Sequence, residues 1–156
     1  MYCLSIVNYK RIESKEVKIG SLKVGAKNPV VIQTMTNTTT QNINQTVEQS
    51  EKCILNGAQL VRVTTPTIDD VRALKEIVEK VKEKFSNSVF VADIHFSPKV
   101  AIEAAKIVDK IRINPGNFVN SKKYDSLEKE LEDVQTNLKE LINVCKQNKT
   151  AIRRSE

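Results

Sequence analysis

Tryptophan is absent from this chain of 156 residues, and aromatic residues make up only 4% of it. Glycine and proline occur four times each, which is too rare for a flexible linker or a low-complexity segment. No apolar stretch approaches the roughly 20 residues that a membrane-spanning helix needs. The apolar residues at the start are followed by Lys10 and Arg11, and they are too few for a secretory signal. We therefore expect one compact globular unit without a membrane partner.

Cysteine is also scarce. Cys3, Cys53 and Cys145 are far apart and odd in number, so the sequence contains neither a disulfide framework nor a local zinc or cluster motif. This usage indicates a reducing compartment. Cys53 and Cys145 fall within helical patterns, where the expected role is that of a small buried apolar residue.

Basic residues outnumber acidic ones by 25 to 19, which gives a formal charge of +6 and favours anionic ligands. The longest basic runs are only pairs, Lys122-Lys123 and Arg153-Arg154. Because aromatics are also few, a nucleic-acid partner is not expected. A phosphorylated small molecule accounts for the charge as well, although many lysines on helix faces serve only to keep the surface hydrated.

Apolar periodicity divides the chain into an N-terminal segment, residues 1–29, and a main fold, residues 30–156. Residues 16–28 alternate around Gly20-Ser21 and predict a β-hairpin. Strands are then predicted at 30–33, 59–65, 88–92 and 110–113, and the start of a fifth strand at 150–153. Helices are predicted at 43–57, 68–85, 100–108 and 126–146. The last helix could form a coiled-coil seam, but a single amphipathic helix packed on a sheet is favoured.

Alternating strands and helices predict an α/β fold with a parallel sheet and right-handed crossovers. The sheet could be open and doubly wound, or it could be part of a TIM (β/α)8 barrel. Strand starts near residues 30, 59, 88 and 109 recur at an even step, which favours the barrel. A complete barrel needs about 250 residues, so we expect the N-terminal portion, about half, of a barrel: four β/α units and the start of a fifth strand.

The four strands end on pairs of residues two positions apart, so both side chains of a pair point to the same side of the strand. The pairs are Gln33 and Met35, Arg62 and Thr64, Asp93 and His95, and Arg112 and Asn114. Barrel enzymes bind ligands at the C-terminal ends of their strands. Polar side chains gathered there are costly unless they meet one another or a ligand, and one anionic ligand would satisfy them together.

Purely structural roles are open for the same residues. Arg62 or Arg112 could form a structural ion pair with Asp93. His95 could be a hydrogen-bonded structural residue, or with Asp93 it could supply two ligands of a metal. No third His or Cys lies nearby in the sequence, so a metal site is not expected. Residues 112–117 could form only a turn, since Asn-Pro-Gly favours turns, although a turn does not explain the arginine.

Four segments resemble those of the 4-hydroxy-3-methylbut-2-enyl diphosphate synthase family. Residues 31–38, V-I-Q-T-M-T-N-T, are similar to its V-Q-S-M-T-N-T segment, with Thr34 in place of the usual serine. Residues 60–64 resemble its I-V-R-V-T strand, residues 91–96 its V-A-D-I-H-F segment, and residues 110–117 its K-I-R-I-N-P-G-N segment. The matches occur in the family's order, and the resemblance runs from about residue 17 to residue 153.

The resemblance implies an iron–sulfur oxidoreductase of isoprenoid biosynthesis, which reductively opens the ring of 2-C-methyl-D-erythritol 2,4-cyclodiphosphate. It implies that Arg62 and Arg112 bind the diphosphate and that Asp93 and His95, as catalytic residues, orient the substrate hydroxyls or pass protons. The remaining residues implied in substrate binding are Gln33, Thr64, Asn114 and Asn117.

The family's three Cys and one Glu that hold a [4Fe-4S] cluster belong to a C-terminal domain, and none of the three cysteines here matches a cluster ligand. Phe118-Val119 and the helix ending at Cys145 resemble the longer form of the family. The resemblance also implies a ferredoxin or flavodoxin type of electron donor, a homodimer for the complete enzyme, and a bacterial cytoplasmic or plastid location.

The match stops where the family continues I-R-I-G, because this sequence reads Arg153-Arg154-Ser155-Glu156. We therefore expect the remaining barrel strands and the iron–sulfur domain to be absent. Two alternatives stay open. The chain could be a truncated fragment without activity, since a half barrel exposes sheet edges and apolar helix faces. It could also belong to another phosphate-binding barrel enzyme, such as a pterin-binding synthase, which needs no cluster.

Overall fold

A computed structural model describes residue 7, residues 13–114 and residues 126–154 of the chain. Five parallel strands form one sheet in the order in which they occur along the chain. They are β3 (Gln33–Met35), β4 (Leu60–Thr64), β5 (Val89–Asp93), β6 (Lys110–Ile113) and β7 (Ala151–Arg154). Four helices connect them: α1 (Ile43–Leu55), α2 (Ile68–Lys84), α3 (Pro98–Ala104) and α4 (Leu127–Asn148). A separate antiparallel hairpin consists of β1 (Val17–Ile19) and β2 (Leu22–Val24).

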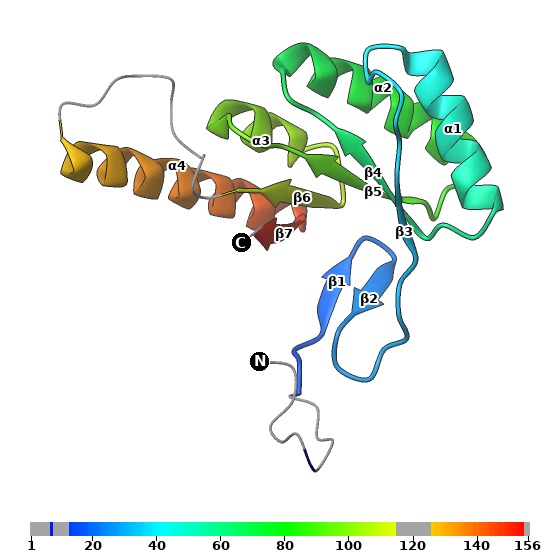
Figure 1. The fold of residues 1–156 in the computed structure, drawn as a ribbon, viewed down its shortest axis with the longest axis horizontal. Coiled ribbons are helices and arrows are strands. Elements are labelled where there is room, and N and C mark those ends of the chain that lie inside the picture. Colours follow the sequence, from blue (N-terminus) through cyan, green and yellow to red (C-terminus); the bar gives the residue numbers. More distant parts are fainter. Residues whose placement is uncertain (1–6, 8–12, 115–125, 155–156) are drawn as a thin grey trace.

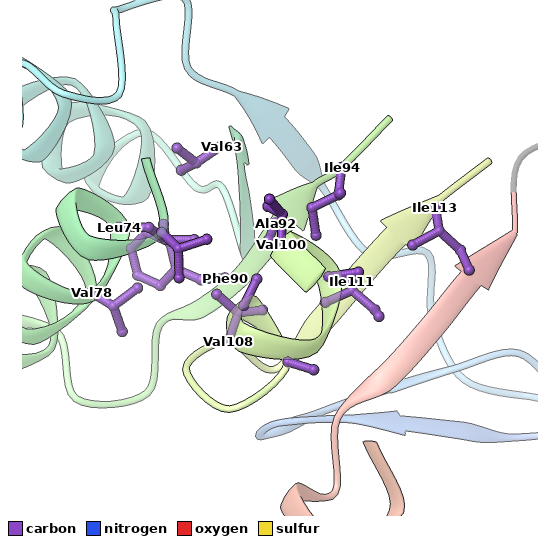
Figure 2. Close-up of a cluster of buried hydrophobic side chains, with 14 of the residues drawn as sticks. Val63, Leu74, Val78, Phe90, Ala92, Ile94, Val100, Val108, Ile111 and Ile113 are labelled. Carbon is purple, nitrogen blue, oxygen red and sulfur yellow. The ribbon is translucent and has the colours of Figure 1, made fainter. Parts of the chain in front are cut away.

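The helices cover one face of the sheet, and the hairpin lies on the other side (Figure 1). Alternate residues of the central strands point to the helices, and Figure 2 shows Phe90, Val63 and Ile111 in the resulting core with Leu74 and Val78 of α2. A doubly wound sheet carries helices on both faces, whereas a barrel carries them only outside. The arrangement therefore confirms the predicted part of a TIM barrel.

Three helices, α1, α2 and α4, begin within one residue of their predicted starts, whereas α3 covers Pro98–Ala104 and not the predicted 100–108. Local sequence signals determine these starts. Thr67 and Asp70 form a capping box at the start of α2, in which each side chain bonds the backbone N–H of the other residue. Ser97 caps α3 and is followed by Pro98 in the first turn. Helix α4 starts after the capping residue Ser126.

The hairpin closes the N-terminal end of the inner face of the sheet. Ile19 is only 4% exposed and packs with Leu60, Val89 and Val91 of the sheet. At the turn, Ser21 Oγ donates a hydrogen bond of 3.0 Å to the Asn87 carbonyl. The inner face is therefore apolar where the hairpin covers it, at the N-terminal end of β4 and β5.

The first predicted strand has different bounds in the structure. The prediction covers 30–33, but β3 begins at Gln33, and Val30 and Ile32 are 93% and 59% exposed. The reason is position: β3 is an edge strand that pairs only with β4, over three residues. An apolar run at a sheet edge cannot be distinguished by periodicity from a buried strand.

Helix α4 packs on the core mainly through its C-terminal half. Leu141 and Cys145 are 0% and 3% exposed, whereas Leu127 and Leu131 are 70% and 52% exposed. The predicted helix on a sheet is present, and burial raises the pKa of the Cys145 thiol to about 11, which is consistent with the apolar role expected for it. None of the helices in the described part of the chain is long and apolar enough to cross a membrane.

Candidate anion-binding site

The strand register brings polar residues of three neighbouring strands to one face of the sheet. Thr64 of β4 lies opposite Asp93 of β5, which lies opposite Arg112 of β6. Arg62 precedes Thr64 by two positions, so its side chain leaves the same face. This is the face away from the helices, at the C-terminal ends of the strands, where barrel enzymes bind their ligands.

Asp93 links the two predicted arginines into an Arg–Asp–Arg cluster, formed by Arg62, Asp93 and Arg112. Asp93 Oδ2 accepts hydrogen bonds from Arg62 Nε, at 3.0 Å, and from Arg62 Nη2. Asp93 Oδ1 accepts one from Arg112 Nη1 at 2.8 Å. The carboxylate side chain is 1% exposed, and the two guanidinium side chains are 20% and 24% exposed. The ion pair considered from the sequence is present, and it involves both arginines.

Charge and burial act in opposite directions on Asp93. Burial alone would raise its pKa, but hydrogen bonds from Arg112 and Arg62, together with their positive charges, hold the pKa below its ordinary value. The carboxylate is therefore ionised at neutral pH and compensates only one of the two guanidinium charges. Each guanidinium has five N–H donors, and three donors in all bond Asp93. Donors and one net positive charge are left for an anion.

The other predicted residues lie at different distances along the strands. Thr64 and Asn114 are half-buried at the ends of β4 and β6. His95 is half-buried beyond the end of β5, with its ring centroid 5.8 Å from that of Phe96. Thr64 is level with Asp93 in the register, whereas Asn114 and His95 follow the Arg–Asp–Arg cluster on the C-terminal side of the sheet. Asn117 lies outside the described residues.

Gln33 is predicted at the end of its strand, and this placement is wrong. Because β3 is shifted, Gln33 is its first residue, is exposed, and pairs with Leu60 at the N-terminal end of β4. Met35, two positions later, is the residue opposite Arg62. A direct contact between Gln33 and a ligand at the Arg–Asp–Arg cluster is therefore not supported by its position in the register.

Two cations on the same face were not among the predicted site residues. Lys110 precedes Arg112 by two positions on β6, and Arg153 of β7 lies opposite Arg112. Both positions could have been predicted from the sequence, because every second residue of a strand points to the same face of the sheet. With Arg62, Arg112 and Asp93 they give this face four positive charges and one negative charge. A cleft of about 580 Å³ next to it is lined by Thr64, Pro66, Asp70 and the loop of residues 35–40.

The described residues do not provide a cluster site. No group of three or more His, Cys, Asp or Glu side chains that could hold a metal ion occurs among them. Cys145 is buried in the apolar core, and Cys53 is half-buried on α1, with Thr34 Oγ1 at 3.8 Å from its sulfur. A [4Fe-4S] cluster therefore does not fit the described part of this chain.

These features define part of a TIM barrel whose strand ends present a cationic face. The chain belongs to the GcpE TIM-barrel domain family, whose profile matches residues 14–154. The family resemblance of the four strand-end segments is thereby confirmed.

Curated relatives agree with the family assignment. The 4-hydroxy-3-methylbut-2-en-1-yl diphosphate synthase (flavodoxin) of Phocaeicola vulgatus is 39% identical over 158 residues, covering 96% of this chain and 26% of the relative. That of Leptospira interrogans is 43% identical over 74% of this chain and 18% of its own length. The chloroplastic enzyme of Oryza sativa, named for ferredoxin, is 36% identical over 97% of this chain and 22% of its own length. The chain thus spans about a quarter of the length of the curated relatives it matches.

Proposed function

We propose that this chain forms the substrate-binding barrel part of a 4-hydroxy-3-methylbut-2-enyl diphosphate synthase. The proposed ligand is 2-C-methyl-D-erythritol 2,4-cyclodiphosphate, and the reaction of the whole enzyme is its two-electron reductive ring opening with loss of a hydroxyl as water. The observation that carries the proposal is the Arg–Asp–Arg cluster at the strand ends. Two guanidiniums held close together by one carboxylate suit a diphosphate, because guanidinium groups bind phosphate oxygens in pairs.

The proposed roles follow from the contacts of each residue. Arg62 and Arg112 bind the diphosphate, and Thr64 and Asn114 add neutral hydrogen bonds. Asp93 uses both carboxylate oxygens on the arginines, so its contribution is to hold the guanidiniums in position. The predicted role of Asp93 at the substrate hydroxyls stays a prediction.

His95 is the residue left to orient the substrate hydroxyls or to pass a proton. It is half-buried beyond β5, and its two ring nitrogens can donate and accept hydrogen bonds. The electrons require a redox group, for which the family resemblance implies a [4Fe-4S] cluster. Because the described residues offer no such site, we propose substrate binding and proton transfer for them, and no electron transfer.

The proposal extends to partners of the whole enzyme. The names of the relatives mention flavodoxin and ferredoxin, and we propose a donor of one of these types. A homodimer and a location in a bacterial cytoplasm or a plastid are proposed on the family resemblance. The family match does not support the pterin-binding synthase considered from the sequence, so a pterin diphosphate serves only as a comparison ligand.

Calorimetric titration of the chain with the cyclic diphosphate tests the proposal. Replacing Arg112→Ala removes a charge-assisted donor, so we expect binding at least about tenfold weaker than in the unchanged chain. Arg72→Ala is the matched control, because Arg72 pairs with Asp69 on the exposed face of α2; its affinity should not change. Circular dichroism checks that each variant is folded. Equal affinities of the two variants, or a preference for the pterin diphosphate, would contradict the proposal.

A further inference from the structure

Lys110 occupies an unusual place for a lysine, on the inner face of the sheet. It is the first residue of β6, and its partners in the register are Val91 of β5 and Ala151 of β7. Arg112 follows two positions later, so both side chains leave the strand on the same side. Lys110 is therefore level with Arg62 in the register and lies two positions nearer the hairpin than Asp93 and Arg112.

No acid compensates this charge within the described part of the chain. The ion pairs found there do not include Lys110, and Asp93 is already bonded through both oxygens to the two arginines. Its charged neighbours are cations, Arg153 and Arg62. Burial, and then the charges of Arg153 and Arg62, lower the pKa of Lys110. A half-buried ammonium group among like charges is stabilised when an anion reaches it.

The surroundings leave room for such an anion. A cleft of about 380 Å³ lies between the strands and the hairpin, and Val17, Ile19 and Val24 of the hairpin line it. All charged residues that line it are cations: Lys15, Lys110, Arg153 and Arg154. The hairpin offers apolar groups at these three positions, so they supply no counter-charge, and their apolar surface strengthens the attraction between charges in the cleft.

We propose that Lys110 is a further anion-binding residue of this site. It binds phosphate oxygens beside the Arg–Asp–Arg cluster, on the side nearer the hairpin. The inference rests on the proposed function, because it assigns to the same ligand a second point of attachment. Guanidinium groups bind phosphate through pairs of donors, whereas an ammonium group acts as a compact charge. Together they select a ligand with two linked phosphate groups over one with a single phosphate.

Inorganic diphosphate and inorganic phosphate are the probes for this selection. We compare the unchanged chain with Lys110→Met, Lys110→Arg and the control Lys106→Met, since Lys106 is exposed and pairs with Glu103. Lys110→Met should weaken diphosphate binding about tenfold or more, and phosphate binding by a smaller factor. Lys110→Arg should restore part of the affinity, and Lys106→Met should bind like the unchanged chain.

A second measurement distinguishes a direct contact from a structural role. The side-chain signal of Lys110, followed by NMR in the unchanged chain, should titrate at a higher pH when diphosphate is bound than when it is absent. An unchanged Lys110 titration at saturating diphosphate would overturn the inference even if Lys110→Met fails to fold. Normal diphosphate binding by Lys110→Met, with binding lost in Arg112→Ala, would overturn it and leave the proposed function standing. No binding by the unchanged chain would overturn both.

Discussion

Replacing Phe90→Ala is expected to lower the free energy of unfolding by about 3–5 kcal/mol. Phe90 is a fully buried side chain at the centre of the sheet, where it packs with residues of β4, β6 and the helices (Figure 2). The substitution removes apolar surface from the core and leaves a cavity that the surrounding close-packed side chains fill only in part. Urea unfolding followed by circular dichroism measures the loss.

Phe96→Ala is the matched control for this prediction. It makes the same chemical change at a side chain that is 64% exposed, so its effect should stay within about 0.5 kcal/mol. If the two variants lost similar stability, the core shown in Figure 2 would not be the part of the molecule that determines its stability.

Replacing Asp93→Ala should lower the free energy of unfolding by about 3 kcal/mol. The carboxylate is 1% exposed and bonds both Arg62 and Arg112. Without it, two partly buried guanidiniums face each other with no intervening negative charge. Asp69→Ala provides the comparison, because Asp69 and Arg72 form an exposed pair, and such pairs contribute about 0–1 kcal/mol. Similar losses in the two aspartate variants would contradict the assigned role of Asp93.

The same cluster makes stability depend on pH in a defined direction. The pKa of Asp93 is below its ordinary value in the folded chain, so the unfolded chain binds the proton more readily. The contribution of Asp93 is present above the unfolded-state pKa and is lost as the pH falls through the lower folded-state pKa. Asp93→Ala should therefore lose part of the acid dependence of unfolding that the unchanged chain shows, as urea unfolding at a series of pH values measures.

The order of strands and helices could be predicted because each unit has its own local signal. The capping residue Thr67 and the apolar stripe of α2 lie close together in the sequence, and β6 has its predicted bounds, Lys110–Ile113. The exposure of residues at the edge of a sheet has no such local signal, because it depends on which strands pair. The exposure of Val30 and Ile32 depends on a sheet edge that periodicity cannot indicate, and this shift also misplaced Gln33.

The candidate site could be predicted in part for a similar reason. Strand endings identified Arg62, Asp93 and Arg112, but whether they pair with one another depends on the register between strands, which the sequence does not specify. Lys110 and Arg153 were overlooked as site residues because a single lysine or arginine in a basic chain usually lies on the surface. Their common face becomes visible only when β6 and β7 are aligned.

NMR mapping shows directly whether the C-terminal ends of the strands bind the substrate. The backbone amide signals of the chain are recorded while 2-C-methyl-D-erythritol 2,4-cyclodiphosphate is added. We expect the largest changes at Thr64, Asp93 and Arg112, at the C-terminal ends of the strands, and no change at Lys75 and Glu79 on the exposed face of α2. Changes centred on the exposed faces of the helices, or no changes at saturating concentrations, would contradict the claim that this face of the barrel binds the substrate.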